Sequence, residues 1–378
     1  MPNTITKQFQ LLIKPVGADC NLACEYCFYK RAAALYPGET GRPMPDDVLE
    51  QMTSSYLQLR FDTSIFSWQG GEPTLAGLDF FRKVAELQKR YGAEGQNIGN
   101  AFQTNAVLID DEWAKFLAEH DFLVGVSLDG PPEIHDRYRR THTGSGSAEK
   151  VLAAIEHLKR HAASFNILTL VTQANVDQAR SVYRWLVAQG FRYLQFIPCL
   201  ERDAEGDRAE YAIKPGQYGK FLCEVFDEWC DNGFPHISVR TFDSMVNYYV
   251  TGVPAVCIFS ESCDAYILVE RNGDVYPCDF FVFPEWKLGN VMDKDIDRFI
   301  VCGLKQKFAK QKSDLCKGCE RCEWKLMCWG GCMKDRLFPR HDYGAPSYFC
   351  AAYRNFFEHT NAQFKQIAQN LIAGRRYV

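Results

Sequence analysis

The sequence predicts an α/β fold in which parallel strands alternate with helices and close part-way into a barrel. Six apolar segments have the length and composition of strands, and a helical segment follows each of them. The expected strands are residues 11–14, 63–69, 98–104, 122–128, 165–172 and 193–198. Six such units are fewer than a complete eightfold barrel contains, so we expect a partial (β/α)6 barrel.

Helical patterns fill the segments between these strands and follow the last one. The expected helices are residues 45–59, 78–91, 110–120, 148–161, 176–189 and 217–230. In parallel α/β folds, ligands bind at the carboxyl ends of the strands. We therefore expect the functional residues in the loops that follow the strands.

The character of the sequence changes near residue 236, where the expected strands become short. Ten of the 16 cysteines lie between Cys257 and Cys350. We therefore predict two domains, residues 1–235 and residues 236–378.

Composition and charge exclude several classes of protein. The net charge of −4 gives no basic excess for binding nucleic acid, and 47% hydrophobic residues are typical of a globular chain. No segment is apolar enough to span a membrane, and the first residues do not form a signal peptide, which predicts a cytoplasmic protein without a membrane partner. In a reducing compartment, 16 cysteines indicate metal or redox chemistry and not disulfides.

Three cysteines follow the first expected strand at a spacing that can bind one metal centre. Cys20, Cys24 and Cys27 form a Cys-x3-Cys-x2-Cys motif. A structural zinc site or an ordinary 4Fe–4S site has four ligands, so three cysteines would leave one iron of a cluster open. A zinc site completed by a distant residue is the alternative.

A glycine-rich segment follows the second expected strand, and its sequence is Gln69-Gly70-Gly71-Glu72-Pro73. A tight turn alone could explain the glycine pair. Together with the three cysteines and Tyr26 before the last of them, the segment resembles the radical S-adenosylmethionine (SAM) superfamily. The resemblance implies that the cysteines hold a 4Fe–4S cluster whose open iron binds SAM. One-electron cleavage of SAM would then give a 5′-deoxyadenosyl radical.

The same resemblance implies a set of residues that contact SAM. They are Tyr26, Gln69, Gly70, Gly71, Glu72, Ser127, Arg139 and Leu200. Arg139 could instead be a solvated loop arginine, and Leu200 could belong to the core.

The later cysteines resemble the cysteine-rich SPASM domain, which is built of short strands and helices and holds two auxiliary 4Fe–4S clusters. The resemblance implies one ligand set of Cys257, Cys263, Cys278 and Cys332, and a second of Cys319, Cys322, Cys328 and Cys350. Eight cysteines saturate two clusters, which suits electron transfer. Cys316 could shift the second set by one cysteine, and two zinc ribbons are the competing interpretation.

Segments along nearly the whole chain are similar to the anaerobic sulfatase-maturating enzymes. They include residues 12–15, 69–77, 103–105, 127–130, 165–168, 194–197, 276–280 and 288–290. The resemblance implies oxidation of a sulfatase cysteine or serine to Cα-formylglycine. One departure is Ala106, where relatives usually have glycine.

The resemblance also implies roles in the reaction. Asp279 matches the general base, although it could be an exposed turn residue. Candidates for substrate contacts are Tyr29, Gln69, Asn105, Gln195 and Asp243. The expected partners are a sulfatase polypeptide and an electron donor of the flavodoxin or ferredoxin type.

Two other function classes remain open at this point. A related maturase could build thioether or carbon–carbon crosslinks in a peptide. Such enzymes commonly carry a leader-binding domain, for which a first cysteine at residue 20 leaves no room. The other class is a non-catalytic electron carrier or zinc scaffold.

Overall fold

The computed structural model describes residues 8–38, 40–339 and 342–374, which divide into two compact units. Unit 1 comprises residues 1–127, 139–165 and 263–309, and unit 2 comprises residues 128–138, 166–262 and 310–378. Each unit therefore combines segments from the N-terminal and C-terminal parts of the chain. The domain boundary near residue 235 remains a prediction.

Unit 1 contains a sheet in the strand order β10-β9-β8-β1-β2-β3-β4. Its strands are β1 (Gln10–Ile13), β2 (Thr63–Trp68), β3 (Asn97–Thr104), β4 (Phe122–Ser127), β8 (Tyr266–Val269), β9 (Asp274–Tyr276) and β10 (Gly289–Asn290). Strands β1 to β4 are parallel, β8 joins the free edge of β1 in the same direction, and β9 and β10 continue antiparallel. Leu11 of β1 lies opposite Phe66 of β2 and Ile267 of β8, and all three are fully buried.

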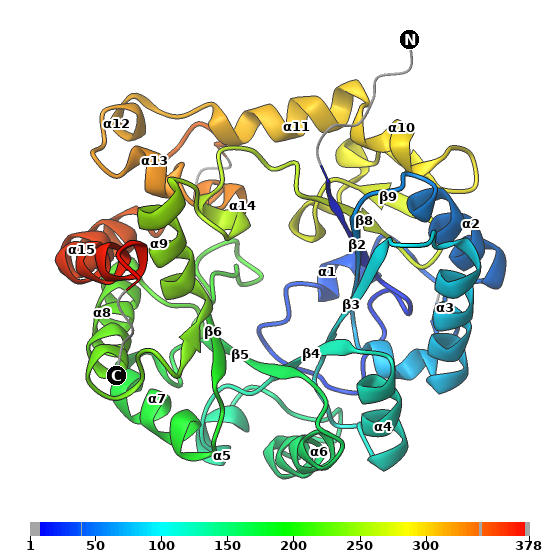
Figure 1. Cartoon of the computed structure of the whole chain (residues 1–378), viewed down its shortest axis with the longest axis horizontal. Coiled ribbons are helices and arrows are strands. Elements are labelled where there is room, and N and C mark those ends of the chain that lie inside the picture. Colours follow the sequence, from blue (N-terminus) through cyan, green and yellow to red (C-terminus); the bar gives the residue numbers. More distant parts are fainter. Residues whose placement is uncertain (1–7, 39, 340–341, 375–378) are drawn as a thin grey trace. The chain divides into compact units, whose positions relative to one another are not determined.

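Helices of unit 1 lie along the strands, as Figure 1 shows for α2, α3 and α4. They are α1 (Lys30–Ala33), α2 (Asp46–Leu57), α3 (Leu78–Tyr91), α4 (Asp111–Glu119), α6 (Ala148–Arg160) and α10 (Ile296–Ile300). Aromatic rings fill the layer between strands and helices. Phe81 of α3 contacts Trp68, Phe102 and Phe122 edge to face, a geometry that aromatic pairs prefer.

Unit 2 contains the parallel strands β5 (Phe165–Val171, whose first residue belongs to unit 1), β6 (Tyr193–Pro198) and β7 (Ser238–Val239). Its helices are α5 (Pro132–His135), α7 (Ala179–Ala188), α8 (Pro215–Asn232), α9 (Arg240–Thr251), α12 (Lys317–Glu320), α13 (Lys325–Cys328), α14 (Met333–Arg336) and α15 (Cys350–Ile372). The long helix α15 packs on α8 and α9 (Figure 1). Helix α11 (Gly303–Ser313) begins in unit 1 and ends in unit 2.

The α/β fold class is confirmed, because all six expected strands are present and parallel neighbours pair as expected in each unit. The six expected helices are also present, with ends that differ by up to three residues. Among the described residues, no helix combines the length and the apolar character that crossing a membrane requires.

The turn after β3 adopts an unusual backbone conformation at Ala106, whose φ is +61°. This is the position at which the resemblance leads us to expect glycine. Ala106 is fully buried, and its backbone N–H donates to Thr104 Oγ1 at 2.8 Å. Alanine therefore adopts the left-handed conformation in this turn, which costs about 1–2 kcal/mol of folding free energy.

We predict that Ala106→Gly raises the free energy of unfolding by up to about 1 kcal/mol, because relief of this strain exceeds the added chain entropy of about 0.4–1 kcal/mol. Denaturant midpoints of the two proteins provide the measurement. Ala114→Gly in the buried face of α4 is the matched control and should destabilise by about 1 kcal/mol. Equal destabilisation by both substitutions would contradict the inference that the backbone at Ala106 is strained.

Candidate active site

The three cysteines of the first motif lie in the loop after β1, within unit 1. Leu22 donates its backbone N–H to Cys20 Sγ at 3.4 Å, and Asn105 Nδ2 lies 3.6 Å from the same sulfur. The pKa of Cys20 is raised to about 12, chiefly by burial and also by negative charge on Glu72, Cys24 and Cys27, while the Leu22 hydrogen bond opposes the shift. The three thiols are therefore close enough to act on one another.

The cysteine loop and the glycine-rich segment approach each other at the distance of a backbone hydrogen bond. Gly71 N–H donates to Gly17 O at 2.9 Å, and Glu72 N–H donates to Asp19 O at 2.7 Å. A Cβ on Gly71 would lie 1.8 Å from Asp19 O, so no other residue fits there. The close approach, and not only the turn, explains the glycine.

Glu72 is fully buried, and donors of its own chain surround its carboxylate. Oε1 accepts from the Thr74 N–H, the Thr74 hydroxyl and the Thr104 hydroxyl, while Oε2 accepts from the Asn105 N–H at 2.7 Å. Burial raises the pKa of Glu72, and these hydrogen bonds oppose the shift. The carboxylate thus fixes the ends of β2 and β3 beside the cysteine loop.

Of the other predicted SAM contacts of unit 1, Gln69 and Ser127 lie at the same ends of the strands, and Tyr26 and Arg139 lie in loops. Gln103 Nε2 donates to the hydroxyl of Ser127, the last residue of β4, at 3.1 Å. The Arg139 guanidinium lies 5.3 Å from the centre of the Tyr26 ring, which is a cation–π contact. Gln69 follows β2 directly and donates its N–H to Ile13 O.

The predicted site residues Leu200, Gln195 and Asp243 belong to unit 2. Leu200 is buried at 3% exposure, after β6, and Gln195 lies on β6 itself. Asp243 lies in the first turn of α9 and accepts a hydrogen bond from the Ser238 hydroxyl. The roles of these three residues stay predictions.

Asp279 lies beside the cysteine loop in unit 1, on the turn after β9. Its side chain is 14% exposed, and Lys14 Nζ lies 3.8 Å from its Oδ2. The Phe280 ring packs on Phe28 with centres 4.7 Å apart, and Arg31 donates to Phe280 O at 2.6 Å. The turn that carries Asp279 is therefore packed onto the residues that follow Cys27.

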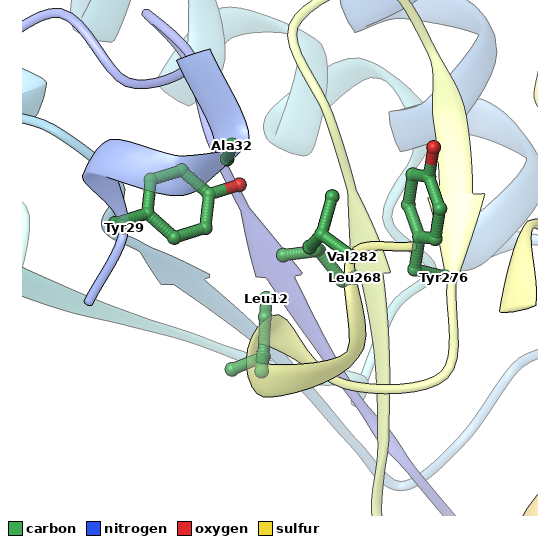
Figure 2. Close-up of a cluster of buried hydrophobic side chains, with 6 residues drawn as sticks. All are labelled: Leu12, Tyr29, Ala32, Leu268, Tyr276 and Val282. Atoms are coloured by element: carbon green, nitrogen blue, oxygen red, sulfur yellow. The ribbon is translucent and has the colours of Figure 1, made fainter. Parts of the chain in front are cut away.

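Tyr29 contacts both Lys14, the partner of Asp279, and Glu270, which directly follows β8. Its ring stacks below the Lys14 ammonium at 4.0 Å, and its hydroxyl donates to Glu270 Oε1. Figure 2 shows Tyr29 and Ala32 facing apolar side chains of residues 268–282. The buried cluster comprises Leu12, Tyr29, Ala32, Leu268, Tyr276 and Val282. Burial lowers the pKa of Lys14, whereas Asp279 and Glu270 raise it.

The predicted auxiliary cysteines are distributed over both units. Unit 1 contains Cys263 and Cys278, and unit 2 contains Cys257, Cys319, Cys322, Cys328, Cys332 and Cys350. In unit 2, Cys319 interacts with Cys316, Cys328 and Cys350, and Cys350 also interacts with Cys322. Five thiols thus gather where one predicted set has four, so the alternative with Cys316 stays open.

Comparison with known proteins identifies the family. The Radical SAM superfamily model matches residues 15–186, and the SPASM model, an iron-sulfur cluster-binding domain, matches residues 257–323. A cysteine-type anaerobic sulfatase-maturating enzyme of Clostridium perfringens is 38% identical over 96% of this chain and 98% of its own length. The chain belongs to the anaerobic sulfatase-maturating enzymes.

Further relatives of this family include both subtypes. A serine-type anaerobic sulfatase-maturating enzyme of Bacteroides thetaiotaomicron is 37% identical over 93% of this chain and 89% of its own length. The solved structure described as native anSMEcpe with bound AdoMet and Cp18Cys peptide has a TM-score of 0.88 and 36% identity, and the match covers 97% of this chain and 100% of that one. The predicted family, the radical SAM and SPASM organisation and the enzyme class are confirmed.

The residues of this maturase fit iron–sulfur clusters and SAM. All sixteen cysteines are free thiols, and the close backbone approach at Gly71 holds the glycine-rich segment beside the loop that carries Cys20, Cys24 and Cys27. In the part of the chain that the structure describes, no three histidine, cysteine or carboxylate side chains are already arranged around one metal position. When bound, the clusters supply one-electron chemistry, with the thiols as ligands.

Several residues that the sequence analysis did not single out belong to these surroundings. They are the buried Lys14, Glu270 and Arg271 near the cysteine loop, and the buried Lys305, Lys312 and Arg336 near the later cysteines. Lys14 lies at the end of an apolar strand before a proline, which is a weak signal at best. Arg271 donates to Asp19 Oδ2 at 3.3 Å, so a later turn also holds the cysteine loop.

Replacing Cys20, Cys24 and Cys27 together by alanine should abolish SAM cleavage and leave about two-thirds of the iron, because the remaining clusters have separate ligands. Iron per chain and 5′-deoxyadenosine release are the measurements. Loss of all iron, or persistent SAM cleavage, would show that the assignment of the three cysteines is wrong.

Cys316→Ala should leave the iron content unchanged, whereas Cys319→Ala should lower it, because four cysteines saturate a cluster and the predicted set begins at Cys319. Iron per chain and the visible absorption of the two reconstituted variants give the comparison. The reverse result would place Cys316 in the ligand set.

Proposed function

We propose that this enzyme oxidises a cysteine or serine of a sulfatase polypeptide to Cα-formylglycine, with release of 5′-deoxyadenosine and methionine. The observation that carries the proposal is the packing of the Asp279 turn onto the residues that flank the loop of Cys20, Cys24 and Cys27 within one unit. A base beside the radical-generating site suits removal of hydrogen from a carbon that bears a thiol or hydroxyl group. Membership of the family supports the same substrate class.

The reaction balances in three steps. When bound, SAM would supply the radical chemistry that removes one hydrogen atom from the target Cβ. Asp279 accepts the proton of the thiol or hydroxyl group, and one electron leaves the substrate. A serine then yields the aldehyde directly, whereas a cysteine yields a thioaldehyde that water converts to the aldehyde and hydrogen sulfide.

The proposed roles follow the two parts of the site. Cys20, Cys24 and Cys27 hold the SAM-binding cluster, while the contacts to SAM come from Tyr26, Gln69, Gly70, Gly71, Glu72, Ser127, Arg139 and Leu200. Cys257, Cys263, Cys278, Cys332, Cys319, Cys322, Cys328 and Cys350 would hold the auxiliary clusters, which would supply an acceptor for the substrate electron. Tyr29, Asn105, Gln195 and Asp243 place the substrate.

Lys14 and Glu270 give Asp279 and Tyr29 fixed positions in this scheme. The Lys14 ammonium is buried between the Tyr29 ring and the Asp279 carboxylate, which limits the rotation of both side chains. The Tyr29 hydroxyl is held by Glu270. The surroundings of the base are therefore organised before a substrate binds.

We also propose a flavodoxin or ferredoxin as the electron donor and the cytoplasm as the compartment. SAM cleavage needs a one-electron reductant, which such proteins are. A reducing compartment suits a chain whose sixteen cysteines are all free.

Asp279→Asn tests the proposal, because asparagine keeps the shape of the side chain but cannot take up the proton. Formylglycine formation on a Cys-x-Pro-x-Arg peptide, or its serine equivalent, should fall about 10²–10⁴-fold. SAM cleavage and iron content should persist. Asp293→Asn, at an exposed position of the same unit, is the matched control and should retain full turnover.

Two results would contradict the role of Asp279. Full turnover by Asp279→Asn would remove the residue from the reaction. Loss of iron in this variant, with iron retained in Asp293→Asn, would show that Asp279 supports the fold or a cluster.

A further inference from the structure

Lys305, near the start of α11, is buried with its ammonium among backbone carbonyls of the auxiliary-cysteine loops. The residue is 1% exposed. Nζ donates to Cys263 O at 2.9 Å, to Tyr266 O at 2.7 Å and to Pro277 O at 3.2 Å. A protonated lysine has three N–H donors, so these three acceptors match the charged form. Two of the carbonyls belong to a predicted ligand cysteine or to the residue before one.

Lys312, near the end of the same helix, repeats this arrangement in unit 2. It is fully buried, and Nζ donates to Ile258 O at 3.0 Å, to Trp329 O at 2.8 Å and to Gly331 O. Each of these residues is adjacent in sequence to a predicted ligand, and those ligands are Cys257, Cys328 and Cys332. The carbonyls are neutral, so they hold the ammonium without cancelling its charge.

The backbone turn between Cys328 and Cys332 presents its carbonyls to Lys312 and to a second buried cation, Arg336. Trp329, Gly330 and Gly331 all have positive φ, at 44°, 70° and 68°. The turn directs the carbonyls of residues 329 and 330 to the buried Arg336 guanidinium as well, at 2.6 and 3.1 Å. The Gly331 N–H donates to the carbonyl oxygen of Cys328 at 3.0 Å, and the N–H groups of residues 330 and 331 also interact with the Cys328 sulfur.

Hydrogen bonds to cysteine sulfur and positive charge act on a cluster in the same direction. A 4Fe–4S cluster gains one negative charge on reduction, so both stabilise the reduced form and raise the reduction potential. Burying an ammonium carries a desolvation penalty, so a buried lysine is retained where its charge and hydrogen bonds serve a purpose. Helix α11 also has exposed lysines, Lys307 and Lys310, which have no such cost.

We propose that Lys305 and Lys312 are positioning residues for the auxiliary clusters: they fix the loops that carry the ligand cysteines and raise the reduction potential of the clusters bound there. The inference rests on the ligand cysteines named under the proposed function. A higher potential makes an auxiliary cluster a better acceptor of the electron that the oxidised substrate releases. The effect on potential exists without any substrate.

The experiment compares Lys305→Met, Lys312→Met and the matched control Lys307→Met in the reconstituted full chain. Methionine keeps the length of the side chain and removes the charge and the donors. Iron per chain and midpoint potentials are measured by EPR-monitored titration without a sulfatase peptide. Signals that added SAM leaves unchanged belong to the auxiliary clusters.

We expect at least one auxiliary midpoint to become more negative in each buried-site variant, or a selective loss of about one-third of the iron with SAM cleavage retained. Lys305→Gln and Lys312→Gln restore two donors without the charge. They should therefore recover iron but keep the more negative midpoint.

Two outcomes would overturn the proposal. In one, the iron content and midpoints of the buried-site variants match those of Lys307→Met. In the other, the buried-site variants lose all clusters together with their helical circular dichroism, which would make the lysines ordinary core residues. Because no sulfatase peptide is used, a failure to form formylglycine would leave this result standing, and unchanged midpoints would leave the proposed function standing.

Discussion

The backbone contact between the cysteine loop and the glycine-rich segment is the constraint on which the site in unit 1 depends. Gly71 and Glu72 donate their N–H groups to the carbonyls of Gly17 and Asp19, at a separation that excludes a Cβ. The Asp19 carboxylate in turn accepts from the Gly41 N–H at 2.8 Å and from Arg271. The cysteine loop is thereby held by the segments of Gly71, Gly41 and Arg271, which are distant from one another in sequence. These contacts restrict the positions of its cysteines.

Buried cations complement this framework of thiols and carboxylates. Lys14 faces Asp279 in unit 1, whereas Lys305 and Lys312 face backbone carbonyls near the later cysteines. A cation paired with a carboxylate contributes little net charge to its surroundings, but one held by carbonyls keeps its charge. A buried lysine therefore fixes a carboxylate in unit 1, and near the later cysteines it supplies positive charge. The acceptors around each ammonium determine which effect it has.

Much of the fold followed from the sequence because strands such as residues 122–127 are continuous apolar segments and helices such as α3 have a regular apolar face. The cysteine motifs were equally readable because their spacing is local. The pairing of β8 with β1 was not, since four residues such as Tyr266–Val269 carry no signal for a distant partner. Lys305 and Lys312 were missed for a similar reason: lysines are usually exposed, and backbone acceptors leave no trace in a sequence.

Glu72 illustrates how a motif residue can be required by the protein itself. Oε1 accepts the Thr74 N–H and Oε2 accepts the Asn105 N–H, so both oxygens face donors that cannot rotate. A glutamine would place its NH2 group against one of these N–H groups in either orientation, because an amide has a single acceptor oxygen. A buried donor without an acceptor costs about 1–3 kcal/mol. The backbone at the ends of β2 and β3 therefore selects a carboxylate at residue 72, independently of any contact that this side chain makes with SAM.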